Sequence, residues 1–262
     1  MISTISKPSC GGREASTTSN KDTTMKKYLV IVVVMFSTFL ICGATYFDKP
    51  NRADSNQLSS NKVEWVDLNL PSGILWCSCN IGATTPEGYG NYFAWGEIKP
   101  KDSYSWNNYI YSDDKNRLTK YDTLILRPES INLEPTDDAA HAIWGDGAHI
   151  PTEAEWYELV YNTTNIWTTL NGVHGYLLTS QNGNSIFLPA AGQFIGNNLY
   201  FVNEFGYYWS SSLLAGDEAV VCRFCSPAIA ISSSSRALGF PVRAVRKKNV
   251  NKSIQQGRLQ RQ

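Results

Sequence analysis

The sequence predicts an α+β fold that is rich in loops, with short antiparallel strands and one or two helices, preceded by one hydrophobic segment. Three observations predict it: short alternating apolar stretches separated by turn residues, one complete helix-start signal, and an uncharged run near the N-terminus. Hydrophobic residues make up 42% of the chain and aromatic residues 12%, which is typical of a folded domain with a sizeable core.

Residues 28–47 form 20 consecutive residues without a charge. As a helix they would extend about 30 Å, the thickness of a bilayer core. Methionine and two lysines at 25–27 fit the start of an export signal, so we expect translation to begin at the methionine. The run is expected to remain as a membrane anchor, to be cleaved after Ala44, or to be lipidated at Cys42. Each outcome places the rest of the chain outside the cytoplasm, in the periplasm or at the cell surface.

Composition divides the chain into five expected parts. A polar stretch without periodicity separates the apolar run from the first strand pattern, as a linker would. The parts are residues 1–24, disordered or an upstream artefact; 25–47, signal peptide or transmembrane anchor; 48–62, linker; 63–245, the folded domain; and 246–262, a basic tail.

Charge separates the folded domain from its flanks. Between Val63 and Val242 the sequence holds 8 Lys/Arg against 19 Asp/Glu, a net charge of −11. An acidic surface repels nucleic acid, so none is expected to bind the folded domain. The tail is expected to be a solvated, disordered end, with contact to anionic lipid, envelope polymer or nucleic acid as the alternative.

The first elements follow from alternation and punctuation. Alternating residues from Val63, a Pro-Ser-Gly turn and a renewed strand pattern at Ile74–Cys77 predict a β-hairpin. Residues 99–147 are rich in Asp, Asn, Tyr and Pro and are expected to form long ordered loops.

One helix start is clear, and short strands follow it. Thr152 and Glu155 form a capping box, which predicts a helix that ends near Asn162. Ser232–Ser235 is expected to be a loop. Strands are expected at Gly175–Thr179, Ser185–Leu188, Tyr207–Ser211, Ala219–Cys225 and Pro241–Val245.

Four of the six cysteines lie in the domain. Cys222 and Cys225 fall in an expected strand, where residues i and i+3 face opposite sides, so they cannot easily pair or share a metal. Buried free thiols are the favoured interpretation, and a bridge to Cys77 or Cys79 is the alternative.

Five separated strings follow one another along the domain: LPSGILWCSCNIGATTPEGYGNYFAWGE (70–97), PTEAEW (151–156), GNSIFLPAAG (183–192), GYYWSSS (206–212) and PVRAV (241–245). Together they resemble the Fibrobacter succinogenes major paralogous domain family, which is common in exported Bacteroidetes proteins. That family is similar in fold to C-type lectins and to formylglycine-generating enzymes. The resemblance implies a C-type-lectin-like domain whose first and last strands lie close together, with Trp65, Trp76, Trp95 and Trp209 as packing residues.

Catalytic chemistry finds little support in the residues. The formylglycine-generating enzymes act through two nearby cysteines. Here Cys222 and Cys225 have CxxC spacing in an expected strand, so the resemblance does not extend to the oxidase activity. The three histidines, His141, His149 and His174, occur without a hydrolase motif and are expected to be structural.

One loop carries several acidic residues. Calcium favours such oxygens, but the spacing is not that of an EF-hand, and a solvated acidic loop is favoured. No metal and no cofactor are predicted. The residues are Glu134, Asp137, Asp138 and Asp146.

Recognition of a partner is the favoured function. The stretch Tyr207–Arg236 combines aromatic and arginine residues, the usual anchors of recognition, and such a face late in the chain is what the resemblance implies. Its alternative role is core packing. The sequence therefore predicts a non-catalytic cell-envelope or surface binding module for an unknown protein or glycan, with an oxidase of the formylglycine-generating type or a purely structural envelope protein as alternatives. The candidate ligand-binding residues are Arg223, Tyr207, Tyr208 and Arg236.

Overall fold

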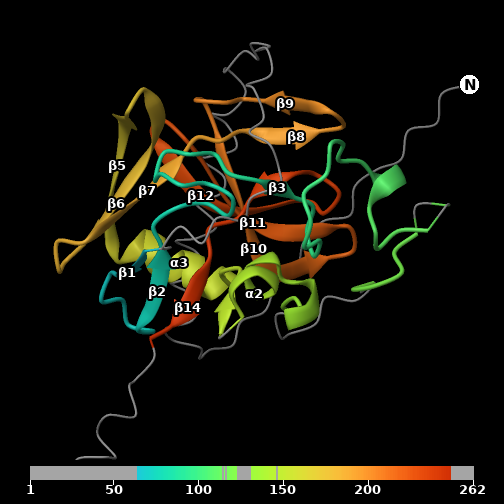
Figure 1. The fold of residues 1–262 in the computed structure, drawn as a ribbon, viewed down its shortest axis with the longest axis horizontal. Coiled ribbons are helices and arrows are strands. Elements are labelled where there is room, and N and C mark those ends of the chain that lie inside the picture. Colours follow the sequence, from blue (N-terminus) through green and yellow to red (C-terminus); the bar gives the residue numbers. More distant parts are fainter. Residues whose placement is uncertain (1–63, 114, 116, 123–130, 146, 249–262) are drawn as a thin grey trace, which may run out of the picture. The chain divides into compact units, whose positions relative to one another are not determined.

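The computed structural model describes residues 64–113, 115, 117–122, 131–145 and 147–248 (Figure 1). All of them belong to the second of the two compact units of the chain, 44–262. The expected start site, apolar run and linker lie outside the described residues, as does the tail beyond Lys248. Within the described ranges, no helix is long and apolar enough to cross a membrane.

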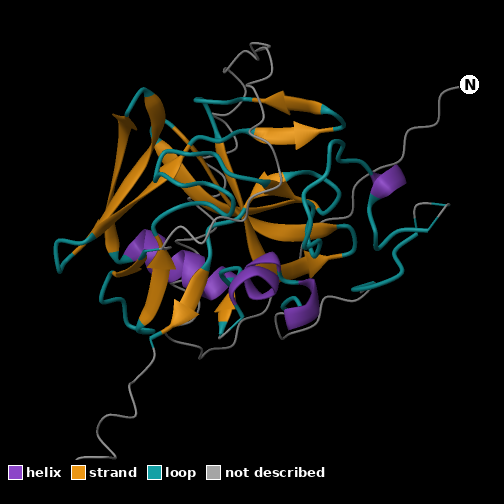
Figure 2. Ribbon diagram, in the orientation of Figure 1, coloured by secondary structure: helices purple, strands orange, loops and turns teal. Residues whose placement is uncertain are grey.

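Antiparallel sheet dominates the described residues. Strands account for 44% of them and helices for 12%, so the predicted loop-rich fold with short antiparallel strands and few helices is confirmed at that level (Figure 2). Helices are short: η1 (Trp106–Asn108), η2 (Pro135–Asp137), α2 (Ala139–Trp144) and α3 (Glu153–Tyr161).

One four-stranded sheet joins the two ends of the domain. Val245 pairs with Trp76, so the last strand lies beside the first hairpin, as the resemblance implies. The predicted hairpin is also confirmed, with Trp65 opposite Cys77. The final strand extends to Lys247, past the predicted boundary at 245. In order, the strands are β1 (Trp65–Asp67), β2 (Ile74–Cys77), β14 (Val245–Lys247) and β4 (Ala148–His149).

Four smaller sheets complete the described part. One three-stranded sheet contains β5 (Thr163–Leu170), β6 (Val173–Ser180) and β7 (Ser185–Pro189). The other contains β10 (Gly206–Ala215), β11 (Glu218–Cys225) and β12 (Ala228–Ser235). The two-stranded sheets are β13 (Phe240–Pro241) with β3 (Tyr92–Phe93), and β8 (Gln193–Ile195) with β9 (Asn198–Tyr200).

Local chemistry explains the predicted helix. The Thr152 hydroxyl accepts from the Glu155 amide at 3.2 Å, and the Glu155 carboxylate accepts from the Thr152 amide at 2.7 Å. These bonds satisfy N–H groups that have no partner inside the helix. Asn162 is the C-cap, so both predicted ends of α3 are confirmed.

Two expectations about strands are wrong. Ser232–Ser235 is not a loop but the second half of β12, because its backbone pairs with β11 throughout. Pro241–Val245 is not one strand: β13 ends at Pro241 and β14 begins at Val245. The break brings Arg243 into the interior, where it is fully buried.

The β10–β11–β12 sheet separates two cores. On β11, Cys222 and Phe224 belong to a cluster that contains Trp76 and Trp156. Val221 and Ala219 belong to a second cluster, with Trp95, Trp209 and Phe240. Alternate residues of one strand face opposite sides, so this sheet contributes to both cores.

The expected packing role of the tryptophans is confirmed. Trp76, Trp95 and Trp209 have no exposed surface, and half-buried Trp65 packs edge-on against Trp144.

Candidate functional site

Tyr208, one of the predicted ligand-binding residues, lies in the interior. It is fully buried on the core side of β10, opposite Cys222. Its hydroxyl donates to the Pro189 carbonyl at 2.8 Å and accepts from Asn80 Nδ2 at 3.2 Å. Burial raises the pKa of Tyr208. Tyr208 therefore packs and cross-links the core, and its predicted place on an open recognition face is wrong.

Arg236 is likewise fully buried. Its guanidinium carbon lies 5.3 Å from the Trp95 ring centroid and 5.7 Å from that of Tyr109. Its nitrogens donate to the carbonyls of Tyr121 at 3.2 Å and Lys120 at 3.5 Å. Within the described residues, its Nε has no hydrogen-bond partner. Burial lowers the pKa of Arg236, and the charges of Asp217 and Asp122 act against that shift. Arg236 therefore packs against Trp95 and Tyr109 inside the domain and is not exposed for contact with a ligand.

Tyr207 and Arg223 lie side by side on the opposite face of the same sheet. They are register partners on β10 and β11, and both are half-buried. The Tyr207 ring stacks between Phe205, at 6.1 Å, and Phe240, at 5.2 Å. Burial raises the pKa of Tyr207 to about 12, with the Arg223 charge acting against the shift. Their role in binding stays a prediction.

The late cysteines have the geometry expected of a strand. Cys222 is fully buried, and burial raises the pKa of its thiol. Cys225 is half-buried and lies three residues further along β11, so it points to the other side of the sheet. Cys77 is a buried thiol on β2.

Most of the acidic loop has protein partners. Lys120 Nζ lies 2.7 Å from Glu134 Oε2 and 2.5 Å from Asp137 Oδ2. Asp138 is the N-cap of α2, where Oδ1 accepts from the Ala140 and His141 amides. Asp146 lies outside the described residues. Among those described, no group of three or more His, Cys, Asp and Glu side chains is arranged to hold a metal ion.

One hollow in the described surface brings together residues from three distant segments. It encloses about 340 Å³ and is lined by Trp106, Leu118, Asp122 and Asp217, and we refer to it as the Trp106 hollow. Trp106 comes from η1, and Asp217 from the turn between β10 and β11. The hollow therefore lies at the turn of the β10–β11 hairpin, within the stretch Tyr207–Arg236 for which the sequence predicts a recognition role.

Arg236 and Tyr109 support this hollow from behind. Trp106 packs edge-on against Tyr109 at 5.3 Å, and Tyr109 faces the Arg236 guanidinium. The Arg236 amide donates to the Asp217 carbonyl at 3.0 Å, which ties the hairpin turn to the same support. Within the described residues, no ion pair engages the carboxylates of Asp122 or Asp217. The charges of both carboxylates nevertheless act on the Arg236 guanidinium.

Comparison of the chain with protein-family models, curated proteins and solved structures found no match. The family resemblance of the five strings therefore stays a prediction.

The sequence predicts a recognition role for the β10–β11 hairpin but not for three residues that line the Trp106 hollow. Trp106, Leu118 and Asp122 lie in the stretch expected to be ordered loops, and they form no motif. The available signal was local: a tryptophan in a polar loop, away from the Gly- and Pro-rich strings that contain Trp76, Trp95 and Trp209.

Proposed function

We propose that this chain is an exported, membrane-tethered, non-catalytic recognition module with a C-type-lectin-like domain. Its ligand presents a positively charged group, an ammonium or a guanidinium, to the Trp106 hollow. The observation that carries the proposal is the lining of that hollow, in which an aromatic and an aliphatic wall stand beside two carboxylates.

The indole of Trp106 and the carboxylates of Asp122 and Asp217 can each attract a positively charged group of the ligand. A cation over an indole ring gains about 0.5–1 kcal/mol at an exposed site. Asp122 and Asp217 are both exposed, so each adds about 0.2–1 kcal/mol of charge attraction. Arg236 cancels part of this field, but its single charge is outnumbered by the two carboxylates. The net charge of −11 between Val63 and Val242 also favours cationic partners.

Binding of labelled oligoarginine and oligoglutamate peptides to the full chain tests the proposal. We expect the arginine peptide to bind and this binding to depend on Asp122 and Asp217, whereas any binding of the glutamate peptide to the basic tail should be unchanged in D122N and D217N. D122N and D217N should each weaken binding by about 1.5- to 5-fold, the effect of one exposed charge pair. E64Q is the matched control, because Glu64 is an exposed carboxylate outside the hollow. Failure of the arginine peptide to bind, or equal losses in all three variants, would refute the hollow as the site.

The oxidase alternative is less favoured, because Cys222 and Cys225 point to opposite sides of β11. Oxygen consumption that needs either cysteine would revive it. A chain that captures envelope components while binding neither peptide would support the purely structural alternative.

A further inference from the structure

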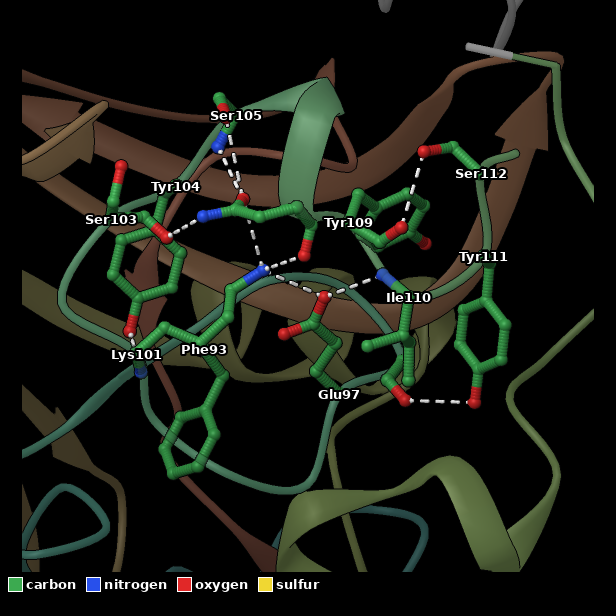
Figure 3. Close-up of polar contacts among 12 residues, drawn as sticks. Phe93, Glu97, Lys101, Ser103, Tyr104, Ser105, Tyr109, Ile110, Tyr111 and Ser112 are labelled. Atoms are coloured by element: carbon green, nitrogen blue, oxygen red, sulfur yellow. Dashed lines mark hydrogen bonds and ion pairs between the residues drawn. The ribbon is translucent and has the colours of Figure 1, made fainter. Parts of the chain in front are cut away.

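An amine, a carboxylate and a carboxamide meet beside η1, in a cluster that the recognition proposal does not use (Figure 3). Lys101 Nζ lies 2.9 Å from Glu97 Oε1. The same nitrogen lies 2.9 Å from the Asn108 backbone oxygen and 3.4 Å from its side-chain Oδ1. A nucleophile, a base and an acyl carbon thus lie together.

The Asn108 carboxamide is held at both ends. Oδ1 accepts from the Ser105 amide at 3.1 Å and contacts the Ser105 hydroxyl at 3.4 Å. Nδ2 donates to the Ser103 carbonyl at 2.8 Å. A backbone N–H directed at the carbonyl oxygen stabilises the negative charge that develops there during attack on the carbon. The carboxamide is therefore fixed and polarised.

The nucleophile needs little movement to reach the carbon. Nζ is 3.4 Å from Oδ1. A C=O bond is about 1.23 Å long, so Nζ lies no more than about 4.6 Å from Cγ. Reacting atoms in a near-attack arrangement are about 3–3.5 Å apart, which a rotation of the flexible lysine chain can supply.

Glu97 is placed to carry the protons. Its side chain is 4% exposed, and its Oε1 accepts from Lys101 Nζ and, at 3.1 Å, from the Ile110 amide. Figure 3 shows Glu97 between the lysine amine and the Ile110 backbone.

We propose that Lys101 and Asn108 form an intramolecular isopeptide bond, with Glu97 as the proton carrier. Glu97 takes a proton from the Lys101 ammonium, and the freed amine attacks Cγ of Asn108. The Nζ–Cγ bond forms, the Cγ–Nδ2 bond breaks, and Nδ2 leaves as ammonia after receiving the proton from Glu97. The second proton of the attacking amine passes by way of Glu97 to ammonia, so the products are a secondary amide and one ammonium ion. No oxidant, reductant or further reactant is needed.

The bond would close a ring that contains Trp106, which lies between the two linked residues in the sequence. It would fix one wall of the Trp106 hollow covalently. The proposal does not depend on ligand binding, and its test does not involve a ligand.

Peptide mapping of the full chain tests the bond. Trypsin cleaves after an unmodified lysine, so a free Lys101 releases a peptide covering 102–115. We expect this peptide to be missing, and residues 63–115 to appear as one peptide lighter by the mass of one ammonia, with fragments that join Lys101 to Asn108. Release of 102–115 from the wild-type chain, with Asn108 intact or hydrolysed to aspartate, would overturn the proposal.

Variants separate the chemistry from folding. E97Q keeps the shape of the side chain but cannot accept a proton, so the linked peptide should be lost while thermal unfolding stays cooperative. N107A is the matched control, because Asn107 is the exposed neighbour within η1, and it should remain linked. A linked peptide in E97Q would overturn the role of Glu97, and its loss in N107A would overturn the assignment to Asn108.

Discussion

Replacement of Arg243 should be among the most destabilising single changes in the domain. The guanidinium is fully buried and donates to Asn80 Oδ1 at 2.9 Å and to the carbonyls of Cys77, Ser78 and Phe187 at 3.0, 2.6 and 2.9 Å. R243A removes every one of these donors at once. A buried acceptor without a partner costs about 1–3 kcal/mol, so the three buried acceptors, Asn80 Oδ1 and the Cys77 and Phe187 carbonyls, together account for about 3–9 kcal/mol. That approaches the whole stability of a small domain, about 5–15 kcal/mol.

Urea unfolding followed by tryptophan fluorescence measures this loss. R243K keeps the charge but has one nitrogen in place of the planar fork, so its loss should lie between those of the wild type and R243A. Arg246 supplies the control: it is half-buried over the Trp65 ring at 4.5 Å, and R246A should cost less than about 1 kcal/mol. A loss below about 1 kcal/mol in R243A would refute the reasoning.

Two further predictions concern pH and backbone conformation. Burial by itself lowers the pKa of His149, but the hydrogen bond at 3.1 Å and the charge of Glu155 outweigh it, so the pKa is raised above 6.5. The stabilisation by protonated His149 is therefore complete below pH 6.5 and is lost as pH rises through the folded-state pKa. In H149F, the free energy of unfolding should depend less on pH in this range. An unchanged slope of that free energy against pH would contradict the role of His149. Gly192 and Gly183 both have left-handed φ, +65° and +84°, but an added Cβ would lie 2.1 Å from the Tyr200 carbonyl only at Gly192. G183A should cost about 1–2 kcal/mol and G192A about 1–3 kcal/mol more by chemical denaturation, and equal losses would count against the close approach.

Features set by neighbouring residues could be predicted from the sequence. The Thr152–Glu155 capping box places the start of α3, because its bonds join groups three residues apart. The first hairpin follows from alternation around a turn.

Features set by distant partners could not be predicted in this way. Nothing local distinguishes the serines of β12 from a loop, because their pairing with β11 makes them a strand. Nothing local shows that Arg243 turns inward, because its acceptors lie up to 166 residues away in sequence.

In the candidate site, too, the features set by neighbouring residues could be predicted from the sequence and those set by distant partners could not. Tyr207 and Tyr208 are adjacent, and strand alternation predicts that they face opposite sides, but it does not say which side is covered. The structure places Tyr208 in the core and leaves Tyr207 half-buried on the other face, where it stacks on Phe205 and Phe240. Asp217 lies inside the predicted stretch, whereas its companion Trp106 meets it only through the fold.

The pairing of β14 with β2 also sets the order of events during synthesis. Synthesis runs from the N-terminus, so β2 leaves the ribosome long before Val245–Lys247, its partner in the sheet. Contacts of such long sequence separation close late and fold slowly. Any cellular factor that meets the emerging chain before then encounters a domain whose first sheet is still open along one strand.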